Sequence, residues 1–230
     1  MSNHSELVKK HFEIKYKDYD KLIRNLIPKY EEMHKKVVGL VNFPKDKKLI
    51  ILDLGVGTGK TALDLLKKFP NVHIGGIDIS KNMIEQGKIR LKEYSDKVDF
   101  KRLDMIDFII KPLKFDACVA VLSVHHLNPK EKQELFEKIF NSLKEDGIFV
   151  IGDIIKFDTK KETEEKEQEW KSFIIKNLGK ERGTFWFKNY QEEDLPDFVS
   201  NQLKWLKDAG FRETGCIWQF MNYAVFYGRK

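Results

Sequence analysis

The chain has 230 residues, of which 41% are hydrophobic and 34% are charged, and its formal net charge is +6. This composition is typical of a globular protein and excludes an intrinsically disordered chain. The 42 basic residues are scattered among 36 acidic ones rather than gathered into an Arg-rich stripe. A lysine-rich solvated surface explains the excess, so the charge does not favour a nucleic-acid partner, although it does not exclude one.

Two further features bear on the compartment. No apolar run approaches the ~20 residues of a membrane span, and the first residues contain no apolar signal-peptide core. Cys118 and Cys216 lie far apart, each in an apolar run, which indicates buried, reduced thiols. We therefore expect a cytoplasmic protein with no membrane partner.

The first part of the chain has a helical pattern. Residues 6–41 are amphipathic, with an interruption at Pro28, and they precede the first strand. From residue 48 onward, short apolar strands alternate with helical segments. The predicted strands are 48–54, 72–79, 98–104, 115–124 and 147–155. Strands that alternate with helices and cross over in the right-handed sense form a parallel, doubly wound α/β sheet.

The later elements complete one predicted domain. Asn128, Pro129 and Glu131 indicate a capped helix that we expect to end at Gly147. A last helix ends at Gly210, and two strand-like runs then follow a hairpin's distance apart. The predicted parts of this single domain, 1–230, are a helical cover (1–47), a cofactor-binding core (48–156), a helical lid insertion (157–200), and a final helix with a strand pair (201–230).

The glycine loop "DLGVGTGKT" follows the first strand. A Walker A loop aligned on Lys60 and Thr61 would need glycine at Leu54, and Asp53 would repel a polyphosphate. A dinucleotide loop of the form G-x-G-x-x-G would need glycine at Lys60. The acid is explained if the ligand is cationic and carries no phosphate, because a carboxylate then attracts it.

The pattern D-x-G-x-G-x-G, formed by Asp53, Gly55, Gly57 and Gly59, resembles that of class I S-adenosylmethionine-dependent methyltransferases. The likeness runs from about residue 48 to the C-terminus through several motifs in order. It implies a Rossmann-like seven-stranded sheet of order 3-2-1-4-5-7-6 with the last strand antiparallel, and S-adenosyl-L-methionine as the cofactor. Asp78 would hold the ribose, and Asp104 the adenine amino group.

The resemblance and the position of the helical cover together predict a set of cofactor-binding residues. They lie in the glycine loop, after the second, third and fourth strands, and in the cover. They are Asp53, Gly55, Gly57, Gly59, Asp78, Ile79, Met83, Asp104, Met105, Val121, Ser123, Tyr19 and Arg24. Leu122 lies within the same fourth-strand motif.

A closer likeness is to small microbial methyltransferases of unassigned substrate, which share the stretch "LSVHHL". The overall plan is also similar to that of carboxy-S-adenosylmethionine synthase, an enzyme of tRNA modification. That enzyme holds its carboxylated cofactor with an arginine, and Trp205 stands at the matching position here. This departure favours ordinary S-adenosylmethionine.

Methyl transfer from a sulfonium is an in-line displacement that depends mainly on positioning, so a general base is optional. His125 and His126 are the candidate catalytic residues; alternatively, they hydrogen-bond the backbone at a helix entry. No residues are spaced as a zinc site, so we expect no metal. In the segment 184–190, Phe185, Trp186 and Tyr190 form either an acceptor pocket or a packed lid.

The sequence thus predicts a methyltransferase that acts on a small-molecule acceptor. Two alternatives stay open at this point: a tRNA- or rRNA-modifying enzyme, and a non-catalytic regulator that binds the cofactor. A homodimer is also left open.

Overall fold

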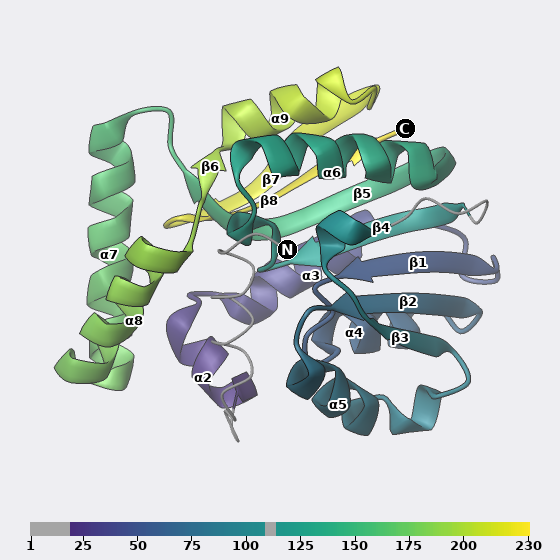
Figure 1. The fold of residues 1–230 in the computed structure, drawn as a ribbon, viewed down its shortest axis with the longest axis horizontal. Helices are drawn as coiled ribbons and strands as arrows, with labels where there is room; N and C mark the ends of the chain where they lie inside the picture. The colour runs from purple at the N-terminus through teal and green to yellow at the C-terminus, as the bar shows by residue number, and fades with distance from the viewer. Residues whose placement is uncertain (1–18, 109–113) are drawn as a thin grey trace.

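The computed structural model describes residues 19–108 and 114–230. A central twisted sheet lies between two layers of helices (Figure 1). Its strands are β1 (Leu49–Leu54), β2 (Val72–Asp78), β3 (Val98–Arg102), β4 (Phe115–Val121), β5 (Leu143–Lys156), β6 (Asp197–Phe198), β7 (Glu213–Phe220) and β8 (Tyr223–Arg229).

The strand order is β3-β2-β1-β4-β5-β8-β7, and β8 runs antiparallel to both of its neighbours. The predicted order is therefore confirmed, with the last strand inserted between the fifth strand and the penultimate one. The two-residue strand β6 is additional: it pairs with the end of β5 and lacks the length or periodicity that a sequence pattern needs.

The helices are α2 (Tyr19–Leu26), α3 (Tyr30–Leu40), α4 (Lys60–Lys68), α5 (Lys81–Arg90), α6 (Pro129–Ser142), α7 (Lys160–Leu178), α8 (Lys180–Glu193) and α9 (Val199–Asp208). Three short 3-10 helices are η1 (Lys92–Tyr94), η2 (Met105–Asp107) and η3 (Val124–His126). No described helix combines the length and apolar character of a membrane span.

Helix α6 begins as predicted but ends earlier. The Asn128 side chain accepts hydrogen bonds from the backbone N–H groups of Lys130 and Glu131, and Glu131 accepts one from Asn128 N. The expected end at Gly147 is wrong. Leu143 is only 1% exposed, takes an extended conformation and pairs with Phe115, so β5 begins there, and an irregularity follows in its pairing with β4.

Two clusters of buried apolar side chains lie on opposite faces of the sheet. One joins helices α6 and α9 to residues such as Phe149 and Phe226. The other joins the sheet to the N-terminal helices and to the insertion, through Met33, Val150 and Trp170 among others. The predicted cover and insertion therefore share one core with the sheet, since Trp170 Nε1 also donates to the carbonyl of Leu26 at 2.7 Å.

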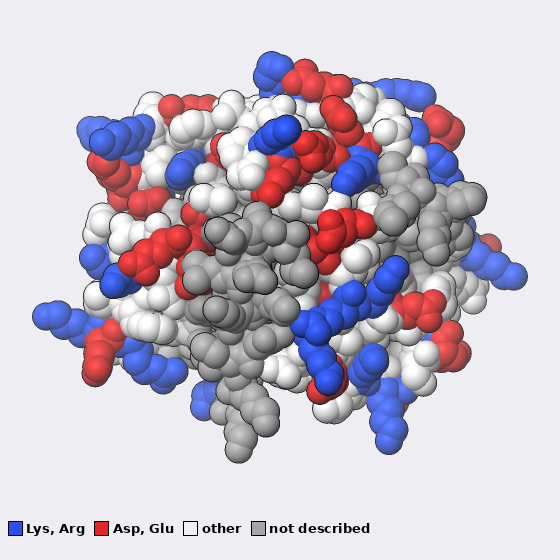
Figure 2. All heavy atoms as spheres, in the orientation of Figure 1, with Lys and Arg blue, Asp and Glu red and all other residues white. Residues whose placement is uncertain are grey.

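The surface carries charges of both signs. On the face shown in Figure 2, Lys and Arg side chains alternate with Asp and Glu over the described residues. Several are paired along helices, as Lys188 with Glu192 at 3.5 Å and Lys204 with Asp208. This pattern agrees with the solvated, mixed-charge surface inferred from the sequence.

Candidate active site

The loop between β1 and α4 brings the backbone close to the end of β4. Gly55 and Gly59 have φ of 70° and 79°, in the left-handed region that favours glycine. A Cβ on Gly55 would lie 2.5 Å from the Cβ of Ser123, and one on Gly59 would lie 3.0 Å from Leu91. Side chains at these positions would push the loop away from its neighbours.

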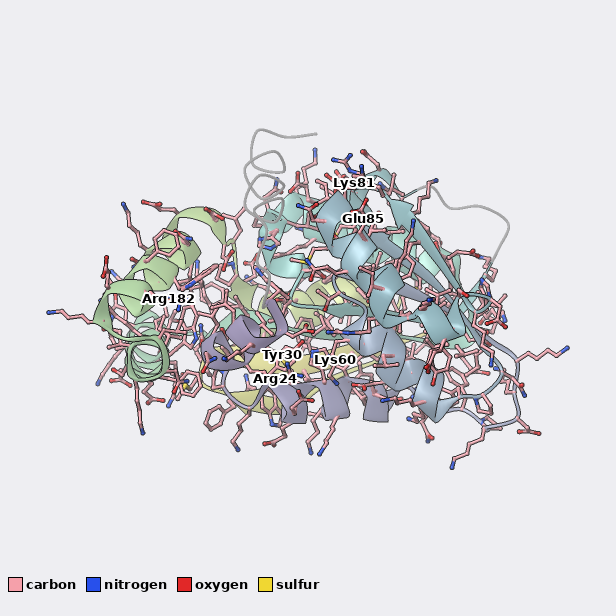
Figure 3. The ribbon with its side chains drawn as sticks, turned by 90° about the horizontal axis from the view of Figure 1, so that it is seen from below. Arg24, Tyr30, Lys60, Lys81, Glu85 and Arg182 are labelled. Atoms are coloured by element: carbon pink, nitrogen blue, oxygen red, sulfur yellow. The ribbon has the colours of Figure 1, made fainter. Side chains whose placement is uncertain are left out.

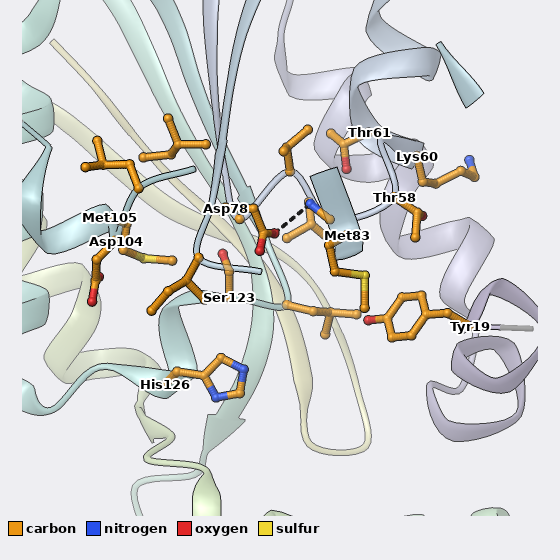
Figure 4. Close-up of a pocket in the computed structure, with 18 of the residues that line it drawn as sticks. Tyr19, Thr58, Lys60, Thr61, Asp78, Met83, Asp104, Met105, Ser123 and His126 are labelled. Carbon is orange, nitrogen blue, oxygen red and sulfur yellow. Dashed lines mark hydrogen bonds between the residues drawn. The ribbon is translucent and has the colours of Figure 1, made fainter. Parts of the chain in front are cut away.

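Asp78, the last residue of β2, is fixed by the backbone. Its Oδ2 accepts a hydrogen bond from Gly57 N at 2.9 Å, drawn in Figure 4, and its Oδ1 accepts one from Ser80 N at 2.8 Å. Burial raises the pKa of this carboxyl group, while hydrogen bonds from the backbone N–H groups of Ser80, Gly57 and Ile79 oppose the rise. An ionised carboxylate has about four acceptor positions, so it can still accept a hydrogen bond from a ligand.

A cavity opens above this loop, and we refer to it as the first cavity (Figure 4). It encloses about 970 Å³, open solvent at its mouth included. Most of the predicted cofactor-binding residues line it: Tyr19, Gly55, Gly57, Asp78, Ile79, Met83, Asp104, Met105, Val121 and Ser123. Segments from five parts of the sequence thus meet in one concave site.

Three predicted residues do not line the first cavity. Gly59 lies beneath the loop, against Leu91. Asp53 is 1% exposed; burial, and then the charge of Asp78, raises its pKa to about 7, against the effect of a backbone hydrogen bond from Ala62. The carboxylates that face the cavity are instead those of Asp78 and Asp104.

Arg24 is the third of these residues. It pairs with Glu31 at 2.9 Å and donates to the backbone carbonyl of Asp20. Figure 3 shows Arg24 beside Tyr30 and near Lys60, at the edge of the helical cover. The carboxylate that pairs with Arg24 is therefore that of Glu31, which belongs to the helical cover itself.

A polar end of the first cavity was not identified from the sequence. It is formed by Tyr30, His34, Thr58, Lys60 and Thr61. Burial, and then the charge of Lys60, lowers the pKa of His34 to about 3, so this imidazole stays neutral and meets Thr61 Oγ1 at 3.3 Å. Lys60 and Thr61 begin α4, where free backbone N–H groups attract anions; that signal was present in the sequence, whereas His34 had none.

A further contact holds the cover over the glycine loop. Thr58 Oγ1 donates to Asp20 Oδ1 at 3.0 Å, and Arg90 pairs with Asp20 and donates to Thr58 Oγ1 at 2.8 Å. Helix α2 is thereby tied to α5 across the loop. Tyr19, at the start of α2, reaches the first cavity as predicted.

The two candidate catalytic histidines have different surroundings. His125 is 6% exposed; its backbone N–H and its ring both hydrogen-bond the buried Asp153. Burial opposes a charge on His125, but the carboxylates of Asp153 and Asp194 outweigh it and raise the pKa. His126 faces the first cavity, and burial followed by the charge of His125 lowers its pKa.

His125, His126 and Asp194 bring potential ligand atoms within 4.8 Å of one another. Asp194 Oδ1 lies 3.4 Å from His126 Nδ1 and 3.7 Å from His125 Nε2. The raised pKa of His125 favours the imidazolium, which has no lone pair to give a metal. We therefore describe the group as an ion pair of His125 with two carboxylates, beside a neutral His126.

A second cavity of about 740 Å³, open solvent included, adjoins the first. We refer to it as the second cavity; it lies between α2, the insertion and the ends of β5 and β8. Tyr19, Leu122 and His126 line both cavities. Of the aromatic residues predicted for an acceptor pocket, Trp186 and Tyr190 line the second cavity, whereas Phe185 does not and is 55% exposed.

Comparisons with known proteins agree with this site. A family model described as "Methyltransferase domain" matches residues 51–147. The carboxy-S-adenosyl-L-methionine synthase of Nautilia profundicola is 29% identical over 219 residues, which cover 92% of this chain and 90% of that protein. Trp205, which stands where that enzyme is expected to have its arginine, lies on α9. It packs against the buried apolar cluster that joins α6 and α9 to the sheet, and it lines neither cavity.

Solved structures share the fold. The phosphoethanolamine N-methyltransferase 2 of Haemonchus contortus superposes with a TM-score of 0.69 at 19% identity, covering 94% of this chain and 47% of that one. The magnesium protoporphyrin IX methyltransferase of Synechocystis PCC 6803, solved with bound S-adenosylmethionine, gives 0.65 at 15% identity and covers 100% and 98%. This chain spans about half the length of the first structure and of several others.

The sheet order, the glycine loop and the carboxylate at the end of β2 define a Rossmann-like enzyme that uses a nucleoside-containing cofactor. Together with the methyltransferase-domain match over residues 51–147 and the relatives, they support an S-adenosylmethionine-dependent enzyme with the fold of class I methyltransferases. Its cofactor is S-adenosyl-L-methionine. The alternative of a non-catalytic regulator is thereby replaced by that of an enzyme.

Proposed function

We propose that this enzyme transfers the methyl group of S-adenosylmethionine to a small organic molecule held in the second cavity, by in-line displacement. One observation carries the proposal: two cavities meet at a wall formed by Tyr19, Leu122 and His126. A donor in the first cavity and an acceptor in the second would face each other across that wall. Positioning of this kind supplies up to ~7–11 kcal/mol of the barrier reduction.

The residues of the first cavity fit the cofactor. The Asp78 carboxylate is suited to the ribose hydroxyls, since it faces the cavity and backbone hydrogen bonds hold it in place. Asp104, Met105, Ile79 and Met83 would surround the adenine. The polar end at Lys60 and Thr61 would take the methionine carboxylate at the N-terminus of α4, where backbone N–H groups are free, while Lys60 itself pairs with Asp64 and Glu31. The bound cofactor supplies an electrophilic methyl group on a sulfonium.

His126 is suited to receive a proton from the acceptor. It lines both cavities, and its lowered pKa keeps it neutral at neutral pH. His125 helps to position His126, because the two rings are adjacent and Asp153 fixes the orientation of the His125 ring. We assign His126 as the catalytic residue and His125 as a positioning residue.

We further infer that residues 1–230 act as one domain whose cover and insertion exclude water from the reaction. The support is the apolar cluster shared by α2, α3, α7, α8 and the sheet. The Asp20–Arg90 pair adds a polar contact over the glycine loop. A site closed in this way strengthens the electrostatic contacts inside it.

The test uses two measurements. Isothermal titration with S-adenosylhomocysteine measures cofactor binding, and a cell extract incubated with S-adenosylmethionine carrying a tritiated methyl group reveals the acceptor. We expect binding, and tritium in the small-molecule fraction. Tritium in the RNA or protein fraction instead would refute the proposed acceptor class, and in the RNA fraction it would favour the RNA-modifying alternative.

A further inference from the structure

Two of the aromatic residues that line the second cavity, Trp170 and Tyr190, have their polar atoms already occupied. Trp170 Nε1 donates to the carbonyl of Leu26, and the Tyr190 hydroxyl donates to Glu167 at 2.6 Å. The two rings are perpendicular, with centroids 5.0 Å apart. The same cavity is lined by aliphatic side chains of α2, among them Leu22 and Leu26. A ligand therefore meets ring faces and hydrocarbon over most of this space.

The charged end of the second cavity is acidic. Glu193 and Asp194 line it, and the described lining residues include no Lys or Arg. The single positive charge of His125 lies between two carboxylates, Asp153 and Asp194. The positive charge next to this group, on Lys132, is bound to Asp197 at 2.9 Å and to a backbone carbonyl. One negative charge at Asp194 is thus left for a ligand.

A buried hydroxyl group also faces this space. Tyr223 is 0% exposed, lines the second cavity, and its hydroxyl has no hydrogen-bond partner among the described residues. Burial raises the pKa of this phenol well above its usual value, so it stays protonated. A buried hydroxyl without a partner is unfavourable, and a polar group on a ligand would satisfy it.

We propose that the methyl acceptor is an amine carried on an apolar, preferably aromatic, body, with its nitrogen at Asp194 and its body against the wall formed by Trp170 and Tyr190. The inference rests on the proposed function, because it names the substrate class of the same site. Asp194 attracts the ammonium group, and the ring faces stabilise a cation that lies against them. A carboxylate ligand would instead be repelled by Asp194, and a neutral alcohol would gain no charge pairing.

The reaction balances with these groups alone. The bound ammonium gives one proton to His126, and the freed nitrogen lone pair attacks the methyl carbon. The carbon–nitrogen bond forms as the carbon–sulfur bond breaks, and the sulfur keeps that electron pair. The products are the methylated ammonium and S-adenosylhomocysteine, and the proton on His126 passes to water.

The test compares acceptors that differ only in the reacting group. The probes are 2-phenylethylamine, 2-phenylethanol and phenylacetate, and the matched set octylamine, 1-octanol and octanoate. Binding to the protein saturated with S-adenosylhomocysteine is measured by titration, and methyl transfer is measured with tritiated S-adenosylmethionine. We expect at least one amine to be methylated and to bind at least about tenfold more tightly than its alcohol and its acid.

Variants locate the effect. Asp194→Asn should reduce amine affinity about tenfold to a hundredfold and leave alcohol affinity within about threefold, since it removes a charge-assisted contact. Tyr223→Phe should weaken the amine less and should fold normally, because it removes one oxygen atom. Glu192→Gln is the matched control: it removes a negative charge from the same helix at an exposed site paired with Lys188.

Equal or tighter binding of the alcohols or acids would overturn the amine proposal, and so would turnover of neither amine. An amine preference that survives Asp194→Asn would also overturn it. Failure of the proposed function looks different: the protein would then methylate none of the probes and transfer no tritium to small molecules of a cell extract.

Discussion

Replacement of Asp78 tests the cofactor site most directly. The carboxylate accepts hydrogen bonds from Gly57 N at 2.9 Å and from Ser80 N at 2.8 Å, and it faces the first cavity. Asp78→Ala removes both acceptors and the charge-assisted contacts proposed for the ribose. Such contacts contribute roughly 1.5–3 kcal/mol, which corresponds to an increase of about 10- to 150-fold in the Kd for S-adenosylhomocysteine.

Asp78→Asn separates the two effects. The amide keeps one acceptor oxygen, so one backbone N–H stays satisfied, but its NH₂ group then faces the other N–H. We expect a loss of affinity near the lower end of the same range. The matched control is Asp99→Asn on β3, where the side chain is 84% exposed and bound to His73, and where the Kd should not change.

Isothermal titration gives the Kd, and thermal unfolding of each variant shows whether the fold persists. An Asp78→Ala variant that unfolds at the normal temperature and binds with unchanged affinity would refute the ribose assignment. A variant that binds weakly only because it is partly unfolded would be recognised by its lowered transition temperature, and the Asn variant then decides.

Four other predictions follow from the same site. His126→Gln should lower kcat by about 10²- to 10⁴-fold without changing the Kd for S-adenosylhomocysteine. The wild-type rate should fall only below pH 6.5, because the pKa of His126 is lowered from that value. A wild-type rate that already falls at higher pH would contradict this role. The pKa of Asp53 is raised to about 7, so this carboxyl group should ionise between pH 6 and 8. Its charge should then increase the affinity for S-adenosylmethionine, a sulfonium, relative to S-adenosylhomocysteine, whose sulfur is neutral, by about fivefold for a screened contribution near 1 kcal/mol. The increase should disappear in Asp53→Asn, and its persistence there would exclude Asp53 as the source. Asp153→Asn should reduce the free energy of urea unfolding by about 3–5 kcal/mol, because it leaves a buried charge unpaired. In the wild-type protein the pKa of Asp153 is lowered and the pKa of His125 is raised, so the pair stabilises the fold between these two pKa values. The stabilisation should be lost as the pH falls through the pKa of Asp153 or rises through the pKa of His125. A free energy of unfolding that does not change with pH across either value would argue against the pair. Dialysis against EDTA should leave methyl transfer unchanged, and a loss restored by a divalent cation would show that His125, His126 and Asp194 hold a metal.

The sheet was predictable because its signals are local. Apolar strands alternate with helices, the starts of α5, α6 and α7 carry side-chain caps, and the crossover rule leaves few topologies. The capping box at Asn128 and the cap at Ser80 illustrate this, since each depends on residues within three positions. The early end of α6 was not predictable, because it depends on pairing between Leu143 and Phe115.

The first cavity was also largely predictable, because its residues follow strand ends that converge at one edge of the sheet. Tyr19 lines this cavity and Arg24 does not, since its partner Glu31 lies across the break between two helices. His34 reaches the cavity only because α3 packs on the sheet. The second cavity forms where α2, α7, α8 and β8 meet, and no local sequence pattern predicts that these elements pack together.

Leu122 links the backbone to the chemistry of the wall between the cavities. It has φ of 53°, which costs a non-glycine residue roughly 1–2 kcal/mol, yet its N–H donates to the carbonyl of Gly152 at 2.9 Å and so keeps the chain in place. A glycine would adopt this conformation without strain, but it would leave no side chain between the cavities. Leu122 and His126 line both cavities, so the strained leucine supports a functional role for its side chain at the proposed meeting point of donor and acceptor.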